Sequence, residues 1–112
     1  MHERWMIKMK ITEQTAKQLF REKYPNGVGY DFAGRKMSIL NYGDSSKVGW
    51  DVDHILPVSK GGTDAKENLQ CTNVLTNDNK ANNTTWHDNG KTWQVRRVKG
   101  NRKKHIVVEI EQ

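Results

Sequence analysis

The sequence predicts an α+β fold, with a single domain over residues 1–112. Three observations favour it: an apolar stripe with helical spacing near the N-terminus, several runs in which apolar and polar residues alternate, and a second helical segment after two of these runs. Only 34% of the 112 residues are hydrophobic and 29% are charged, so the chain can bury only a modest core. Aromatic rings should fill much of that core, and Trp50, Trp86 and Trp93 are expected to belong to it.

An extended arm and a helix come first. Apolar and basic residues alternate over residues 7–11, which predicts a short strand or extended arm. Thr12 is a suitable N-cap for a helix that should run to Tyr24. Its apolar stripe, at steps of three and four residues, consists of Ala16, Leu19, Phe20 and Tyr24. The Pro-Asn-Gly sequence at residues 25–27 ends the helix.

The middle of the chain is interpreted as strands followed by a helix. Residues 30–42 predict two short strands about an Ala-Gly turn, and residues 49–56 predict a longer strand. A polar loop then leads to a second short strand or extended piece at residues 68–71. A helix follows over residues 74–81, although its asparagine and aspartate residues have poor helix propensity. A helix that must present side-chain oxygens to a site can tolerate this weakness, so a functional role is expected here.

The C-terminal third predicts a β-hairpin over residues 91–111, with its turn at residues 99–101. Apolar residues alternate with polar ones on both strands, namely Trp93 and Val95 on the first and Ile106, Val108 and Ile110 on the second. Six basic residues flank the turn: Arg96, Arg97, Lys99, Arg102, Lys103 and Lys104. They match the whole net charge of +6. Such a balance favours an anionic partner, above all nucleic acid, whereas a solvated hairpin tip is the alternative.

Cys71 is the only cysteine, so the chain can form neither an internal disulfide framework nor a cysteine-based zinc site. Its place on an apolar strand predicts a small buried hydrophobe rather than a nucleophile. No apolar stretch approaches the roughly 18 residues that would span a bilayer. The N-terminus has charges scattered among its apolar residues and lacks the apolar region of a signal peptide. A cytoplasmic protein with no membrane partner is therefore expected.

Five polar residues could converge at one end of a compact unit of strands and helix: Asp53, His54, Asn68, Asn77 and Lys80. Asn77 and Lys80 are three residues apart and therefore share a face of the predicted helix. The chemistry that fits this set is metal-assisted hydrolysis of a phosphodiester, which needs an activated water and a cation to stabilise charge on the phosphate. A neutral histidine suits the role of base, and carboxylate and amide oxygens suit Mg²⁺.

Asp53 and His54 are adjacent, so on a regular strand their side chains would point to opposite faces. A metal ligand and a base that serve one phosphate must instead flank it. A bend or a strand end is therefore expected at His54, in agreement with Pro57 close behind it.

The spacing of these residues closely resembles the motif of the HNH endonucleases. That motif is an Asp-His-[Ile/Val]-x-Pro run, then Gly-Gly, then Asn-Leu, then a histidine or asparagine, then lysine. The corresponding residues here are Asp53 to Pro57, Gly61-Gly62, Asn68-Leu69, Asn77 and Lys80. Asn68 follows His54 by fourteen residues, Asn77 follows Asn68 by nine, and Lys80 follows Asn77 by three.

The resemblance implies a ββα-metal (His-Me finger) core at about residues 49–82, in which a helix packs across a two-stranded hairpin with one divalent cation between them. By this resemblance His54 is the general base, and Asp53 and Asn77 bind the metal ion. Asn68 would hold the hairpin loop and orient the histidine. The implied cofactor is Mg²⁺ or Mn²⁺, and Zn²⁺ or Ni²⁺ could also enter the site.

Two departures from the family pattern have consequences. Many members have a final histidine where this chain has Asn77, and the asparagine form should bind soft transition metals less well. Many members also carry two Cys-x-x-Cys pairs that hold a structural zinc, which a chain with Cys71 alone cannot do. The helix at about residues 12–24 and the hairpin at about residues 91–111 are therefore expected to brace the motif.

The resemblance also implies an activity, namely nicking or cleavage of double-stranded DNA by a water that His54 activates. The basic residues of the hairpin are expected to contact phosphates, as are Arg35 and Lys80, for which a solvated surface charge is the alternative. A double-strand break would need a homodimer or two successive events. The rival interpretations are a non-catalytic nucleic-acid-binding module with a vestigial site, and a small metal-binding protein unrelated to DNA.

Overall fold

The computed structural model describes residues 11–111 as a mixed helix and sheet structure, so the predicted α+β class is present. The arm predicted at residues 7–11 lies outside this range except for Ile11. Helices and strands follow in the order α1 (Glu13–Lys23), β1 (Val28–Tyr30), β2 (Lys36–Ser38), β3 (Trp50–His54), β4 (Leu69–Asn73), α2 (Val74–Lys80), β5 (Thr85–Asp88), β6 (Lys91–Arg97) and β7 (His105–Ile110). Neither helix in the described range is long and apolar enough to cross a membrane.

The helix α1 begins where the sequence places it. The Thr12 hydroxyl oxygen accepts a hydrogen bond from the Thr15 N–H at 3.1 Å, which satisfies one of the free N–H groups of the first turn. Ala16 and Phe20 are the buried residues of α1, as the apolar stripe predicts. The Phe20 ring packs against Trp50 at 4.6 Å between ring centroids, so α1 covers the start of β3.

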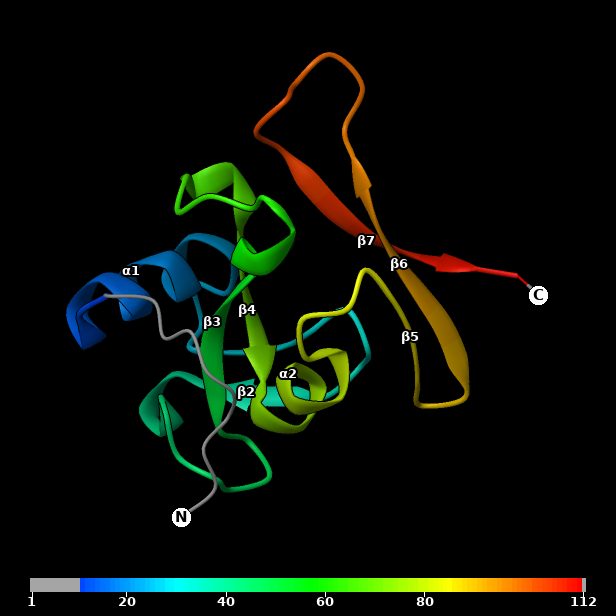
Figure 1. The fold of residues 1–112 in the computed structure, drawn as a ribbon. Coiled ribbons are helices and arrows are strands. Elements are labelled where there is room, and N and C mark those ends of the chain that lie inside the picture. Colours follow the sequence, from blue (N-terminus) through cyan, green and yellow to red (C-terminus); the bar gives the residue numbers. More distant parts are fainter. Residues whose placement is uncertain (1–10, 112) are drawn as a thin grey trace.

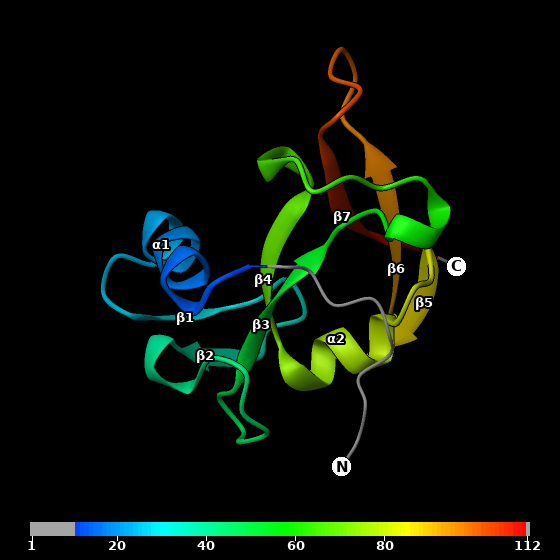
Figure 2. The same cartoon turned by 60° about the vertical axis from the view of Figure 1, so that its left-hand side comes forward.

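A two-stranded antiparallel hairpin, β3 and β4, lies at the centre of the molecule. Its register pairs Trp50 with Asn73 at one end and His54 with Leu69 at the other. Figure 1 and Figure 2 both show this hairpin between α1 on one side and α2 on the other. Trp50 is fully buried, so one end of β3 is anchored in the core while the other end carries His54.

The C-terminal sheet has three strands in the order β5-β6-β7, one more than predicted. The additional strand, β5, pairs with β6 through a turn at Asn89 and Gly90, which both have positive φ angles. An Asn-Gly pair favours a two-residue hairpin turn of this kind, because both central residues must adopt positive φ. That pair is the sequence signal from which β5 could have been predicted.

A second core cluster lies between the C-terminal sheet and the loop before β2. Trp86, Trp93 and Ala33 are buried there, in agreement with the expectation for the two tryptophans. Val95 pairs in register with Val107, and both pack against this cluster. The predicted alternation on the second hairpin strand is wrong at Ile106, whereas Val108 and Ile110 are half-buried on either side of the exposed Glu109. Ile106 is 42% exposed, because the register turns Val107 inward.

Candidate active site

His54 is the last residue of β3, so the predicted strand end is present. The chain then turns, and the Ile55 N–H donates to the backbone oxygen of Asn68 at 2.8 Å. The His54 side chain is 11% exposed, and its Nε2 atom lies 2.6 Å from Oδ1 of Asp64. Asp64 was not among the site residues predicted from the sequence. The available signal was a carboxylate within the motif loop, ten residues after His54.

The Asp53 carboxylate lies beside this histidine in the chain and is almost completely buried. Gln70, its partner on β4, donates a hydrogen bond to Oδ2 at 3.0 Å, and the Lys80 ammonium lies 3.3 Å from the same oxygen. Burial raises the pKa of Asp53 above its ordinary value, although Lys80, Gln70 and His54 act in the opposite direction. Removal from water is therefore the largest influence on this carboxylate.

Lys80 requires a correction, because it was expected to contact DNA. Its side chain is 0% exposed, and Nζ donates to the backbone oxygen of His54 at 2.9 Å. The three-residue step to Asn77 remains, but the Lys80 side chain is turned toward β3 rather than toward solvent. Lys80 thus joins the end of α2 to both Asp53 and His54.

Asn68 makes the loop contacts that were expected of it. Its Oδ1 accepts a hydrogen bond from the Leu56 N–H at 2.9 Å. Its Nδ2 donates to the Leu56 oxygen at 3.1 Å and to the Thr63 oxygen at 2.8 Å. Because Asn68 is only 1% exposed and makes all three of these bonds, it fixes the shape of the loop between β3 and β4.

Asn77 lies three residues before Lys80 in α2, and it is half-buried. The carboxylate oxygens of Asp53 and the amide oxygen of Asn77 are hard donors of the kind that Mg²⁺ prefers. Within residues 11–111 there is no cluster of three or more His, Cys, Asp or Glu residues suited to a metal ion. If Asp53 and Asn77 were to bind such an ion, water would have to fill most of its coordination sphere.

Arg35 also departs from its predicted role as a phosphate contact. Its Nη1 and Nη2 atoms donate to the two carboxylate oxygens of Asp88 at 2.6 and 2.8 Å. Nη1 also donates to the Thr76 hydroxyl at 2.9 Å. The guanidinium therefore joins the turn before β2 to α2 and β5, and these partners already use its planar set of donors.

The six basic residues around the hairpin turn, here called the basic tip, are all exposed: Arg96, Arg97, Lys99, Arg102, Lys103 and Lys104. Figure 2 shows that the turn between β6 and β7 projects beyond the rest of the molecule. Lys104 lines the same cavity as Ile55 and Lys66. The base of the basic tip therefore lies beside the loop that follows His54.

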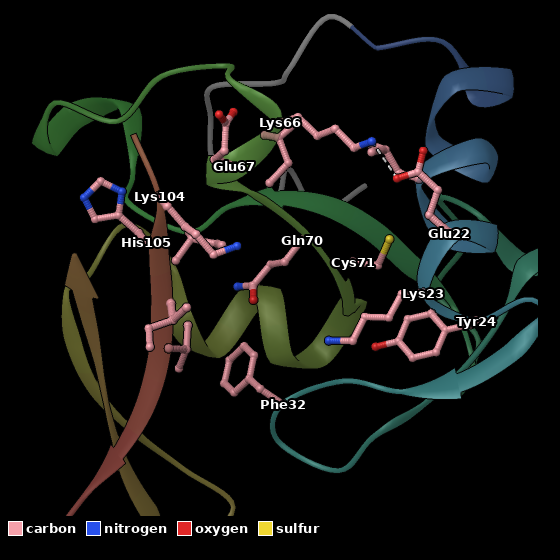
Figure 3. Close-up of a pocket in the computed structure, with 15 residues that line it drawn as sticks. Glu22, Lys23, Tyr24, Phe32, Lys66, Glu67, Gln70, Cys71, Lys104 and His105 are labelled. Carbon is pink, nitrogen blue, oxygen red and sulfur yellow. Dashed lines mark ion pairs between the residues drawn. The ribbon is translucent and has the colours of Figure 1, made fainter. Parts of the chain in front are cut away.

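That cavity, of about 490 Å³, lies between α1, β4 and β7 (Figure 3). Cys71 is among the side chains that line it. Burial raises the pKa of the Cys71 thiol to about 12, with Lys23 acting in the opposite direction. The thiol therefore stays protonated at neutral pH and acts as a small hydrophobe, as predicted. Neither Asp53 nor His54 lines the cavity, so it is distinct from the site at the end of β3.

The end of β3 thus combines a histidine that has a carboxylate partner with a buried aspartate and a helix anchored by lysine. A general base beside oxygen ligands for a divalent cation is typical of hydrolytic enzymes that act on phosphate esters. Residues 32–86 match the family described as HNH endonuclease, and this segment contains β2, β3, β4 and α2. The chain therefore belongs to the HNH endonuclease family, whose members are generally nucleases. Searches of curated proteins and of solved structures each gave no match.

Proposed function

We propose that this protein is a metal-dependent endonuclease that hydrolyses phosphodiester bonds in duplex DNA, with β3, β4 and α2 as its ββα-metal core. The observation that carries the proposal is the position of the His54–Asp64 pair next to the buried carboxylate of Asp53 at one strand end. Lys80 fixes α2 against the same strand end. The family match supports the proposal because it covers these same elements.

In the proposed reaction His54 is the general base. Its neutral imidazole takes a proton from a water molecule as the water oxygen bonds to phosphorus. The bond between phosphorus and the 3′-oxygen breaks, and that oxygen takes up a proton from solvent. The products are a 5′-phosphate and a 3′-hydroxyl. Asn68 contributes by holding the loop that starts at His54.

Asp53 and Asn77 would hold one divalent cation, with Mg²⁺ or Mn²⁺ as the ions that suit their oxygen donors best. Such an ion, when bound, stabilises charge on the phosphate and on the leaving oxygen. Two protein donors give weak binding on their own, so we expect metal affinity to increase when DNA is present.

The basic tip supplies the phosphate contacts of this proposal, because its side chains are exposed and its base, at Lys104, lies beside the loop that follows His54. Contacts to phosphate carry little sequence information, so modest sequence preference is expected. One site cuts one strand, and the expected product of a single chain is a nick. In a homodimer each subunit would cut one strand, and the two nicks together would give a double-strand break.

The test is nicking of supercoiled plasmid in Mg²⁺, in Mn²⁺ and in EDTA. We expect His54→Ala to lower the nicking rate by about a hundredfold or more, because it removes the general base, and EDTA to abolish nicking. His87→Ala is the matched control, since His87 is an exposed residue that bonds to Thr92 on the C-terminal sheet. Duplex binding without nicking in any metal would contradict the proposal and favour the binding module.

A further inference from the structure

The His54 ring contacts the side-chain carboxylate of Asp64. The two residues are ten positions apart, and their 2.6 Å contact spans the loop between β3 and β4. The His54 side chain is 11% exposed and that of Asp64 is 79% exposed. The ring is therefore held by its burial, and the carboxylate approaches it from the solvent side.

The backbone on both sides of Asp64 is fixed by hydrogen bonds. The Thr63 oxygen accepts from Nδ2 of Asn68 at 2.8 Å, and the Ala65 oxygen accepts from the Asn68 N–H at 2.8 Å. The Thr63 hydroxyl also accepts from the Ala65 N–H at 3.2 Å. The position of Asp64 is thus set by Asn68 through the carbonyl oxygens of the residues before and after it, although the carboxylate itself is exposed.

A carboxylate can only accept a hydrogen bond, so Nε2 of His54 must carry the hydrogen in this contact. In the neutral ring the free electron pair then lies on Nδ1, which becomes the nitrogen that can take a proton. We propose that Asp64 is a positioning residue that fixes the tautomer and the orientation of His54 for its role as base. This inference rests on the proposed function, and it also explains physically how Asn68 would orient the histidine.

Because Asp64 is exposed, solvent screens its charge, and the contact contributes little to folding stability. Its effect is therefore expected on the rate of the chemical step rather than on the fold or on DNA binding. Loss of its negative charge should leave duplex affinity unchanged or slightly higher, since the phosphates are also negative. A lower rate of the chemical step, with folding stability and duplex affinity unchanged, would distinguish a positioning role from a merely structural one.

The kinetic test compares Asp64→Ala with Glu67→Ala, which removes an equally negative, exposed side chain three residues further along the same loop. We expect Asp64→Ala to lower the single-turnover nicking rate about tenfold or more without raising KM, because base catalysis depends on the correct tautomer. Asp64→Glu should recover part of the rate, and Glu67→Ala should match the wild type. Equal rates for Asp64→Ala and Glu67→Ala would overturn the inference.

A second readout does not depend on activity. The ring ¹⁵N chemical shifts of neutral His54, assigned by comparison with His54→Ala, report which nitrogen carries the hydrogen. We expect the Nε2-protonated form in the wild type and in Glu67→Ala, and a mixture of both forms in Asp64→Ala. A wild-type ring protonated on Nδ1, or a ring that stays in the Nε2-protonated form in Asp64→Ala, would overturn the inference. If no metal supports nicking, the proposed function fails, and these shifts still decide whether Asp64 fixes the ring.

Discussion

Lys80 combines two constraints at the scale of a single side chain. A buried ammonium is unfavourable unless polar partners replace its water, and here a backbone oxygen and a carboxylate do so. Both partners belong to the two adjacent residues at the end of β3, so one side chain from α2 positions Asp53 and His54 together. We infer that Lys80 contributes to the site by holding the backbone of His54 and the carboxylate of Asp53 in place, rather than through contact with phosphate.

The Arg35–Asp88 pair leads to a prediction about pH. Burial alone would raise the pKa of Asp88, but hydrogen bonds from Arg35 and Asn79 and the charge of Arg35 together lower it below the ordinary 3.8. The folded carboxyl group therefore binds protons more weakly than the unfolded one. Its stabilising effect is present above the unfolded pKa and is lost as pH falls through the lowered, folded pKa.

We expect Asp88→Asn to lower the free energy of unfolding by about 3 kcal/mol at pH 7, because it leaves the Arg35 charge without its carboxylate. The difference from the wild type should begin to shrink below about pH 4, where the carboxyl group of the unfolded chain takes up a proton, and should be lost as pH falls through the lowered pKa of the folded Asp88. Urea unfolding at pH 7 and pH 3 measures both values, with Glu67→Gln as an exposed control. A difference that is the same at both pH values would contradict this account.

Sequence spacing could place these side chains along the chain but could not give their exposure. The adjacency of Asp53 and His54 and the three-residue step from Asn77 to Lys80 are local and could be predicted. Whether that face of α2 points outward depends on its packing against β3, which a helical period cannot reveal. The partner of Arg35 lies 53 residues away, so its internal role could not be predicted from neighbouring residues.

At the scale of elements, the loop between β3 and β4 depends on two glycines in different ways. Gly61 has φ +96° with open space around it, so alanine there would meet only backbone strain. A Cβ atom added at Gly62 would lie 1.7 Å from the Leu56 oxygen. That oxygen cannot move away freely, because it accepts a hydrogen bond from Asn68.

We therefore expect Gly62→Ala to lower the nicking rate and the melting temperature, whereas Gly61→Ala should cost only about 1 kcal/mol of stability. The physical reason is that relief of the Gly62 clash must displace Leu56 or Asn68, which hold the loop that carries Asp64. Thermal unfolding and the plasmid assay compare the two variants directly. Equal effects of the two substitutions would show that this loop is not held as described.

Polar contacts hold the start of α2 in place. The sequence had led us to expect such support for the motif from the N-terminal helix and the C-terminal hairpin. The Asn73 side chain accepts a hydrogen bond from the Leu75 N–H at the start of α2 and donates to the Lys36 and Lys47 oxygens. Asp31 accepts from the Asn73 N–H, which links the turn before β2 to the same point. Asparagine and aspartate at these positions look like turn residues in the sequence, so this network could not be foreseen without long-range contacts.

At the scale of the whole molecule, positive charge and the candidate site are brought together by the fold. The basic tip and His54 are more than forty residues apart in the chain, yet the base of the tip borders the same cavity as Ile55. The tip lies beyond residues 32–86, the segment that matches the family. In our proposal, the basic tip therefore gives this chain DNA contacts that lie outside the segment matched by the family.

The salt dependence of DNA binding tests that role. Each phosphate contact contributes about 0.9 to the slope of log K against log salt concentration, so Arg102→Gln with Lys103→Gln should reduce the slope by about 2. Lys36→Gln with Lys47→Gln is the matched control, because the backbone oxygens of these exposed lysines bond to Asn73, which pairs with Trp50 at the start of β3, at the opposite end from His54. Fluorescence titrations of a short duplex at several salt concentrations measure both slopes. If both double variants reduce the slope equally, positive charge attracts DNA over the whole surface, and the basic tip has no special part in binding.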